Sequence, residues 1–379
     1  MGNPKSADEL YKERLDRIRK AIALEPVDKI PVLGSGPAAY AAMEGVELAD
    51  YLADMKLNCD VNLKFHVDHN LDGAQAHIFS PDVFPRQWFS KVCIPGRELP
   101  SRNELWQVHE MEIIQQEDYD DLLKMGYAAW QKKILDERFE NVEDREKPFY
   151  DYAPIAAQRY VEAGVPVVVG SIFESPFEVL CGGRSLECFL MDDIFEIPEK
   201  LDDVFAEIHR TNMANYEALL QSPAKPLGVW VGGWRGTPTM LNREMFEHYS
   251  WRYMKEIAEL CVRYDVIPIF HLDSDWTPGL DVFKDFEPKK AIMALDGKTD
   301  IYKAKEVVGD TMCIMGDVPA EMFAFGDPQR VYDYASKLIR DLGPTGYIMC
   351  SGCDIPFNAK KENVEAMYQA VNDTCNEPA

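Results

Sequence analysis

The sequence predicts an α/β protein built as a (β/α)8 TIM barrel with an N-terminal helical cap. Three observations predict it: apolar β-rich runs alternate with amphipathic stretches, the runs recur regularly from Val165 onward, and polar residues follow their ends. Nearly continuous apolar strands that alternate with helices are typical of a parallel sheet covered by helices. No Gly-x-Gly-x-x-Gly follows an early strand and no Walker loop is present, which disfavours a doubly wound nucleotide-binding sheet.

The predicted strands follow one another along the chain as short apolar runs. They are Lys29–Gly34 (KIPVLG), Val165–Phe173 (VPVVVGSIF), Pro226–Trp234 (PLGVWVGGW), Val266–Asp273 (VIPIFHLD), Lys290–Asp296 (KAIMALD), Thr311–Asp317 (TMCIMGD) and Gly346–Gly352 (GYIMCSG). Between them, Arg243–Tyr264 and Asp327–Gly343 repeat apolar residues at every third or fourth position, which predicts amphipathic helices. The polar segment Asp136–Pro148 is expected to be a flexible insertion.

The domain organisation follows from length and from the absence of linkers. A chain of 379 residues exceeds the usual size of a single core, so its length allows two domains or one large barrel. No proline-rich or serine-rich linker and no short-period repeat interrupts it. We therefore expect residues 1–379 to form one barrel domain, with residues 1–29 as its N-terminal helical extension.

Charge and cysteine usage restrict the partners and the compartment. A net charge of −25 and a pI near 4.7 repel phosphate backbones and anionic lipid, which excludes nucleic acid and membrane surfaces as expected partners. The start of the chain does not resemble a signal peptide, and no apolar run is long enough to span a membrane. The nine scattered cysteines then fit reduced thiols in the cytoplasm.

Polar side chains gather at the carboxyl ends of the predicted strands, where barrel enzymes carry their chemistry. Glu174 follows one strand and Asp296 ends another, so these two carboxyl groups are candidate catalytic residues. His271 and Asp273 alternate with Leu272, so both project to the same side of a strand. Imidazole, carboxylate and thiolate together at one barrel mouth suit zinc, which takes nitrogen, oxygen and sulfur ligands.

The thiolate would come from the pair Cys350 and Cys353 in the stretch CSGC. A structural zinc knot needs a second close ligand pair, and CSGC has no such partner. A thioredoxin-like redox pair should open a helix after an early strand, whereas CSGC lies near the C-terminus. A dispersed site that uses one cysteine remains. Cys353 lies past the strand while Cys350 lies within it, so Cys353 is the predicted ligand. A purely structural role stays open as the alternative, with His271 as a hydrogen-bonded polar residue and the cysteines as small core residues.

Three stretches of the chain resemble the uroporphyrinogen decarboxylase-like superfamily. They are Arg17–Gly34 (RIRKAIALEPVDKIPVLG), Ala304–Met322 (AKEVVGDTMCIMGDVPAEM) and Ser351–Met367 (SGCDIPFNAKKENVEAM). The resemblance extends from about Arg17 to Val371 and is closest to the corrinoid-dependent methyltransferases, in particular the methyltransferase I component of anaerobic O-demethylases. It implies the same (β/α)8 barrel.

The resemblance also implies a zinc site. The coenzyme M methyltransferases of the superfamily bind zinc through His-x-Cys and a later cysteine, which here correspond to His271, Asp273 in place of the first cysteine, and Cys353. The harder carboxylate makes zinc a stronger Lewis acid toward oxygen. Cys313, on a neighbouring strand, is the expected fourth ligand. Asp285 would fit an Asp…Cys…Cys set of the O-demethylases, but it lies in a predicted helix outside the barrel.

The implied reaction is zinc-assisted O-demethylation, in which a methoxylated aromatic gives its methyl group to the Co(I) corrinoid (cobalamin) of a partner protein. Glu174 would act as the acid at the ether oxygen. The expected partners are a cognate corrinoid protein and a small aromatic methyl ether, and a homodimer is left open. Trp230, Trp234 and Trp276 are candidates to line the pocket, with ordinary packing as the alternative.

Other functions remain to be weighed against this one. Uroporphyrinogen decarboxylase itself is disfavoured, because Pro31–Gly45 (PVLGSGPAAYAAMEG) lacks the arginines that would hold the substrate carboxylates. A corrinoid methyltransferase that uses methanol, a methylamine or a methyl halide stays open. So does a non-catalytic corrinoid-binding or metal-binding accessory protein.

Overall fold

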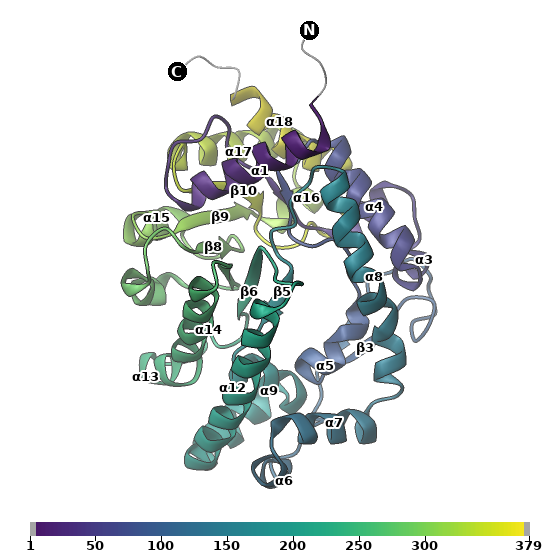
Figure 1. Ribbon diagram of the computed structural model, residues 1–379, viewed down its shortest axis with the longest axis vertical. Helices are drawn as coiled ribbons and strands as arrows, with labels where there is room; N and C mark the ends of the chain where they lie inside the picture. Colours follow the sequence, from purple (N-terminus) through teal and green to yellow (C-terminus); the bar gives the residue numbers. More distant parts are fainter. Residues whose placement is uncertain (1–4, 375–379) are drawn as a thin grey trace.

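The computed structural model describes residues 5–374 and centres on a parallel sheet (Figure 1). Six strands pair in the order β10-β9-β8-β7-β6-β5, and β1 pairs with β2 in parallel. The strands are β1 (Leu33–Gly34), β2 (Gly73–Ala74), β5 (Ser171–Phe173), β6 (Gly228–Gly233), β7 (Ile267–Leu272), β8 (Ile292–Leu295), β9 (Cys313–Val318) and β10 (Tyr347–Ser351).

Single bridges join the two sheets into a ring. Val32, directly before β1, forms a parallel bridge with Met349 of β10, and Ala74 of β2 forms one with Val167. The Val168 N–H also donates to the Ala74 carbonyl at 2.8 Å. The six-stranded and two-stranded sheets therefore supply the eight parallel strands of a TIM barrel, and the predicted fold class is confirmed.

Two predicted segments differ in detail from the structure, and one strand was not predicted. No apolar run marks β2, because Gly73–Ala74 lies in the mixed stretch LDGAQA. Of the long run Val165–Phe173, only β5 is a regular strand. The predicted flexible insertion Asp136–Pro148 is mostly helical, since α7 (Tyr127–Arg138) and α8 (Val142–Glu162) cover most of it.

The N-terminal helix α1 (Ala7–Ile22) covers the amino-terminal end of the barrel, which confirms the predicted cap for the described residues. It begins with a capping box, in which the Ser6 side chain accepts from the Glu9 N–H and Glu9 bonds back to the Ser6 N–H. Its apolar face joins the inward-facing strand residues in one buried cluster, which includes Ile18, Ala21, Ile22, Ile269, Ile292, Cys313, Ile348 and Cys350.

The outer helices lie against the strands and were largely predicted from apolar spacing. The predicted helix Arg243–Tyr264 is α13 (Arg243–Phe246) and α14 (Arg252–Arg263), joined by a π-helical turn. The predicted helix Asp327–Gly343 is α17 (Pro328–Leu342). The others that follow strands are α9 (Pro176–Arg184), α12 (Pro198–Gln221), α15 (Ile301–Val308), α16 (Ala320–Phe325) and α18 (Lys361–Thr374).

A long insertion separates β2 from β5 and lies beside the barrel, drawn in blue to teal in Figure 1. Its elements are α5 (Phe84–Trp88), the antiparallel pair β3 (Lys91–Cys93) and β4 (Gln107–His109), α6 (Asp118–Met125), α7 and α8. Earlier come α2 (Pro37–Met43), α3 (Leu48–Ala53) and α4 (Met55–Asp68). The insertion brings Trp88 to within 5.4 Å of Trp234, ring centre to ring centre.

Two general expectations about the chain can be compared with the described residues. No helix among residues 5–374 combines the length and the apolar character that crossing a membrane requires. The cysteines in that range are all free, and Cys375 lies outside it.

Candidate metal centre

The candidate site is built on β7, which carries His271 next to its last residue and is followed directly by Asp273. His271 pairs in register with Gly232 of β6 and Ala294 of β8, and only 7% of its surface is exposed. Its ring stacks on Trp230 with the centres 4.4 Å apart and the planes 16° from parallel. The strand register therefore holds the imidazole inside the carboxyl-terminal end of the barrel.

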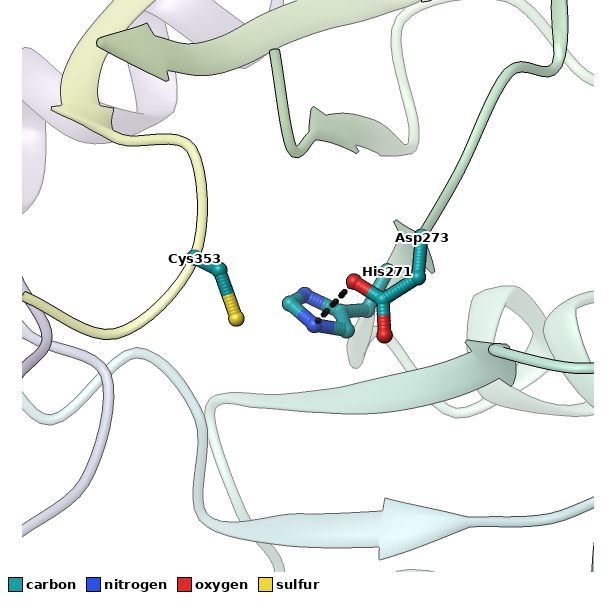
Figure 2. A group of neighbouring side chains, drawn as sticks. All are labelled: His271, Asp273 and Cys353. Carbon is teal, nitrogen blue, oxygen red and sulfur yellow. Dashed lines mark ion pairs between the residues drawn. The ribbon is translucent and has the colours of Figure 1, made fainter. Parts of the chain in front are cut away.

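Three of the predicted ligands converge here. One ligand atom from each of His271, Asp273 and Cys353 lies within 4.8 Å of the others, and this is the single such group of three found in residues 5–374. Nε2 of His271 is 3.5 Å from a carboxylate oxygen of Asp273. Cys353 reaches the group from the loop after β10 and points its sulfur toward the histidine ring (Figure 2).

The donor set and the spacing fit zinc. Zinc–ligand bonds of about 2.0–2.3 Å place tetrahedral ligand atoms roughly 3.3–3.8 Å apart, so the His271–Asp273 distance fits and the whole group needs to contract slightly. Nδ1 of His271 is buried without a hydrogen-bond partner among the described residues. Three protein ligands also leave a fourth position for another molecule, as in catalytic zinc sites.

Burial shifts the pKa values of His271 and Asp273 most, and the neighbouring acidic residues shift them less. Burial lowers the pKa of His271 to about 4, opposed by Asp354 and Asp296, so the imidazole is neutral and able to bind a metal. Burial, with Asp296 and Asp354 adding to it and Arg235 opposing it, raises the pKa of Asp273 to about 7.

Cys353 is an exposed residue, and its sulfur lies beside the His271 ring (Figure 2). Burial of that thiol, together with the charges of Asp354 and Asp273, raises its pKa. A bound dication would reverse the effect, because a coordinating thiol loses its proton.

Cys313, the expected fourth ligand, does not reach the group. It is the first residue of β9 and pairs with Ile292, which in turn pairs with Ile269, two residues before His271. The residue of β9 level with His271 is Met315. Cys313 is fully buried in the apolar cluster closed by α1, where burial raises the pKa of its thiol. It thus lies one side-chain layer below the site.

The remaining alternative ligands also lie elsewhere. Asp285 is exposed at the end of a 3-10 helix (Thr277–Asp285), in agreement with its predicted place in a helix outside the barrel. Cys350 is fully buried within β10, and the Gln75 side-chain amide donates to its sulfur at 2.9 Å. The two cysteines of CSGC therefore have different surroundings, as their positions relative to the strand predict.

Two further carboxylates shape the mouth. Asp296 accepts the backbone N–H of Ser274 at 2.7 Å and that of Lys298 at 2.8 Å, so it joins the loops after β7 and β8. Asp354 accepts a short hydrogen bond from the Ser35 hydroxyl and lies close enough to His271 to act on its charge. Asp354 was not predicted to have a role, although its place directly after Cys353 indicates one.

Glu174, the predicted acid, is buried directly after β5. Burial and the nearby Glu178 raise its pKa well above the usual value, which favours the protonated form of the carboxyl group. Its Oε1 has no hydrogen-bond partner among the described residues. The backbone around it is fixed by the Tyr216 hydroxyl, which lies 2.9 Å from the Glu174 N and 3.2 Å from its carbonyl oxygen.

The three predicted pocket tryptophans have different surroundings. Trp230 stacks on His271, and the ring of Trp234 lies 6.4 Å from it. Trp276 is fully buried, packs on Phe246 and donates from Nε1 to the Asp273 carbonyl at 2.9 Å, so it supports the site from behind.

Comparisons with known proteins agree with this architecture. A family model described as uroporphyrinogen decarboxylase (URO-D) matches residues 131–374, more than half of the chain. A comparison with curated proteins finds no match. Among solved structures, a methyltransferase from Methanosarcina mazei is similar with a TM-score of 0.72 at 17% identity, over 98% of this chain and 99% of that one. At that identity the similarity shows a shared fold.

Proposed function

The chain belongs to the uroporphyrinogen decarboxylase family, and we propose that it is a methyltransferase. Its methyl donor would be a methoxylated aromatic, and its acceptor the Co(I) corrinoid of a partner protein. The observation that carries the proposal is the group His271, Asp273 and Cys353 at the carboxyl end of the barrel, within 4.8 Å of one another. The similar fold of a methyltransferase from Methanosarcina mazei supports it.

The metal proposed for this group is zinc, held by His271, Asp273 and Cys353. When bound, it would supply a Lewis acid that polarises an oxygen of the substrate. This set has the carboxylate of Asp273 in place of a second thiolate. A harder ligand makes zinc prefer a substrate oxygen over a thiol sulfur, so the set suits a donor whose methyl group is bound to oxygen. Asp296 and Asp354 add negative charge around the site, which favours retention of a dication.

The transfer breaks the bond between the methyl carbon and the ether oxygen and forms a bond between that carbon and cobalt. Both electrons of the broken bond leave with the oxygen, and Co(I) supplies the pair for the new bond. The phenolate must then gain a proton, and Glu174 is the group proposed to give it, because burial favours its protonated form and its Oε1 is unpaired among the described residues.

The aromatic side chains near the site suit a ring substrate. Trp230 and Trp234 flank His271, and Trp88 approaches Trp234 from the insertion with ring planes 78° apart. The Trp88 side chain also lies near the carboxyl of Glu174, so the acid and the metal ligands border a common aromatic wall. We place the protein in the cytoplasm, with a cognate corrinoid protein as its partner.

A donor screen tests the proposal. The protein is incubated with zinc, chemically reduced cob(I)alamin and one donor at a time, and the absorbance of methylcobalamin is followed. Methoxylated aromatics such as veratrole or vanillate should give methylcobalamin and the free phenol in equal amounts. Methylcobalamin from methanol or methylamines alone would refute the ether donor while keeping the class. No product from any donor would favour a non-catalytic accessory protein.

A further inference from the structure

We propose that Arg235 forms an anion subsite beside the candidate metal centre, and that the aromatic methyl donor carries a carboxylate which this guanidinium holds. The inference rests on the proposed function, because it names the substrate class of the same site. Arg235 lies two residues past the end of β6, and the last residue of that strand, Gly233, accepts the backbone N–H of Asp273 at 3.1 Å. The guanidinium therefore projects from the same rim of the barrel as the ligand group.

The backbone at Arg235 is fixed by a buried acid. Glu178, fully buried in α9, accepts the N–H groups of Trp234 at 3.1 Å, of Arg235 at 2.9 Å and of Gly236 at 2.9 Å. A carboxylate enclosed by three successive backbone donors holds the loop in one conformation. Glu178 thereby positions Trp234 and Arg235 together, and its oxygens are occupied by the backbone rather than by the guanidinium. A single glutamate within the apolar helix PFEVLCGGR is the sequence feature that indicates this role.

The guanidinium itself has no carboxylate partner at short range. Among the described residues, no Asp or Glu oxygen forms an ion pair with Arg235, and the hydrogen-bond partner of its side chain is the sulfur of Cys181, 3.8 Å from Nη1. Burial raises the pKa of the Cys181 thiol, so that neighbour is neutral. The charges of Glu178 and Glu110 act on Arg235 at longer range, and Arg235 acts on Asp273. Glu178 is bonded to the backbone, as described above, and Glu110 to the Leu186 N–H at 2.6 Å.

A half-buried cation without an ion-pair partner is costly in a protein of net charge −25, where acidic partners are abundant. A carboxylate matches the planar guanidinium with two parallel hydrogen bonds. The walls of Trp88 and Trp234 beside it would hold the ring that bears the carboxylate. One guanidinium fits one carboxylate, and not the several that a porphyrinogen carries.

The test measures binding without turnover, so that it does not depend on methyl transfer. The probes are 3,4-dihydroxybenzoate and its neutral counterpart catechol, titrated by calorimetry into the zinc-loaded full chain. Wild-type protein should bind the benzoate about 10- to 100-fold more tightly than catechol, the size expected for a charge-assisted pair. Arg235→Gln should lose this preference and keep its affinity for catechol. Arg235→Lys should retain part of it, because the charge remains without the planar fork.

The matched control is Arg210→Gln, an exposed arginine on α12 that pairs with Glu207 and should leave the preference unchanged. Equal wild-type affinity for the two probes, or an undiminished preference in Arg235→Gln, would overturn the subsite. If Arg235→Gln does not fold, as judged by its melting curve, the Arg235→Lys result decides. Failure of the proposed function would appear in a different experiment, as the absence of methylcobalamin in the donor screen, whatever the affinities for the two probes.

Discussion

The mouth of the barrel and the layer of side chains beneath it both contain cysteines, in different surroundings. Cys313 and Cys350 lie in the interior, packed among residues such as Ile292 and Ile348 and closed off by α1. Cys353 lies in the loop after β10, beside His271 and Asp273. Position relative to the strand end, and not residue type, therefore separates a packing thiol from a candidate ligand in this fold.

The largest expected effect distinguishes the two cysteines of CSGC. Cys353→Ala removes the only sulfur of the ligand group, so zinc content should fall from one per chain toward zero and methyl transfer by on the order of 1000-fold. Cys350→Ala should retain both. Elemental analysis and the methylcobalamin assay measure the two quantities. A similar loss in both variants would mean that the two thiols act as a pair.

A second large effect is expected at Glu174. Glu174→Gln keeps the size of the buried side chain and removes its proton, so transfer should slow by about 100-fold for donors that release a weakly acidic phenol. Donors with a strongly acidic phenol need less protonation and should be slowed less. Rates for a series of ring-substituted ethers measure this dependence. If every donor loses the same factor, Glu174 does not give the proton.

Much of this comparison could be predicted from the sequence. The apolar runs and the helical spacing indicated the barrel, and the alternation of His271 and Asp273 placed both on one side of β7. The layer of Cys313 could not be predicted, because it depends on the register between β8 and β9, which pairs Cys313 with Ile292. The role of Glu178 also depends on tertiary contacts, since its hydrogen bonds reach Trp234–Gly236 on the next strand's loop.

The pH dependence of metal binding sharpens the assignment of Asp273. Its carboxyl pKa is about 7 without metal, so below that pH zinc must displace one proton from Asp273 and one from Cys353. Zinc affinity should then rise about 100-fold per pH unit below pH 7 and about tenfold above it. Asp273→Asn should show the shallower slope throughout. Chelator competition between pH 5.5 and about 8.5 measures both slopes, and identical slopes in the two proteins would contradict a carboxylate ligand.

The smallest effect is expected in the interior layer. Cys313→Ala removes one buried sulfur from the apolar cluster, which should lower the free energy of unfolding by about 1–2 kcal/mol. Zinc content and the rate of methyl transfer should stay at the wild-type level. Chemical denaturation measures the free energy of unfolding, elemental analysis the zinc content, and the methylcobalamin assay the rate of methyl transfer. A loss of zinc would return Cys313 to the ligand set.

One measurement tests most directly the claim that the barrel mouth transfers a methyl group from an aromatic ether. An ether with a deuterated methoxy group is incubated with cob(I)alamin and either wild-type protein or Cys353→Ala, and the products are analysed by mass spectrometry. We expect fully labelled methylcobalamin and the phenol in equal amounts from the wild type, and neither from the variant. Phenol without labelled methylcobalamin, or equal transfer by both proteins, would contradict the account.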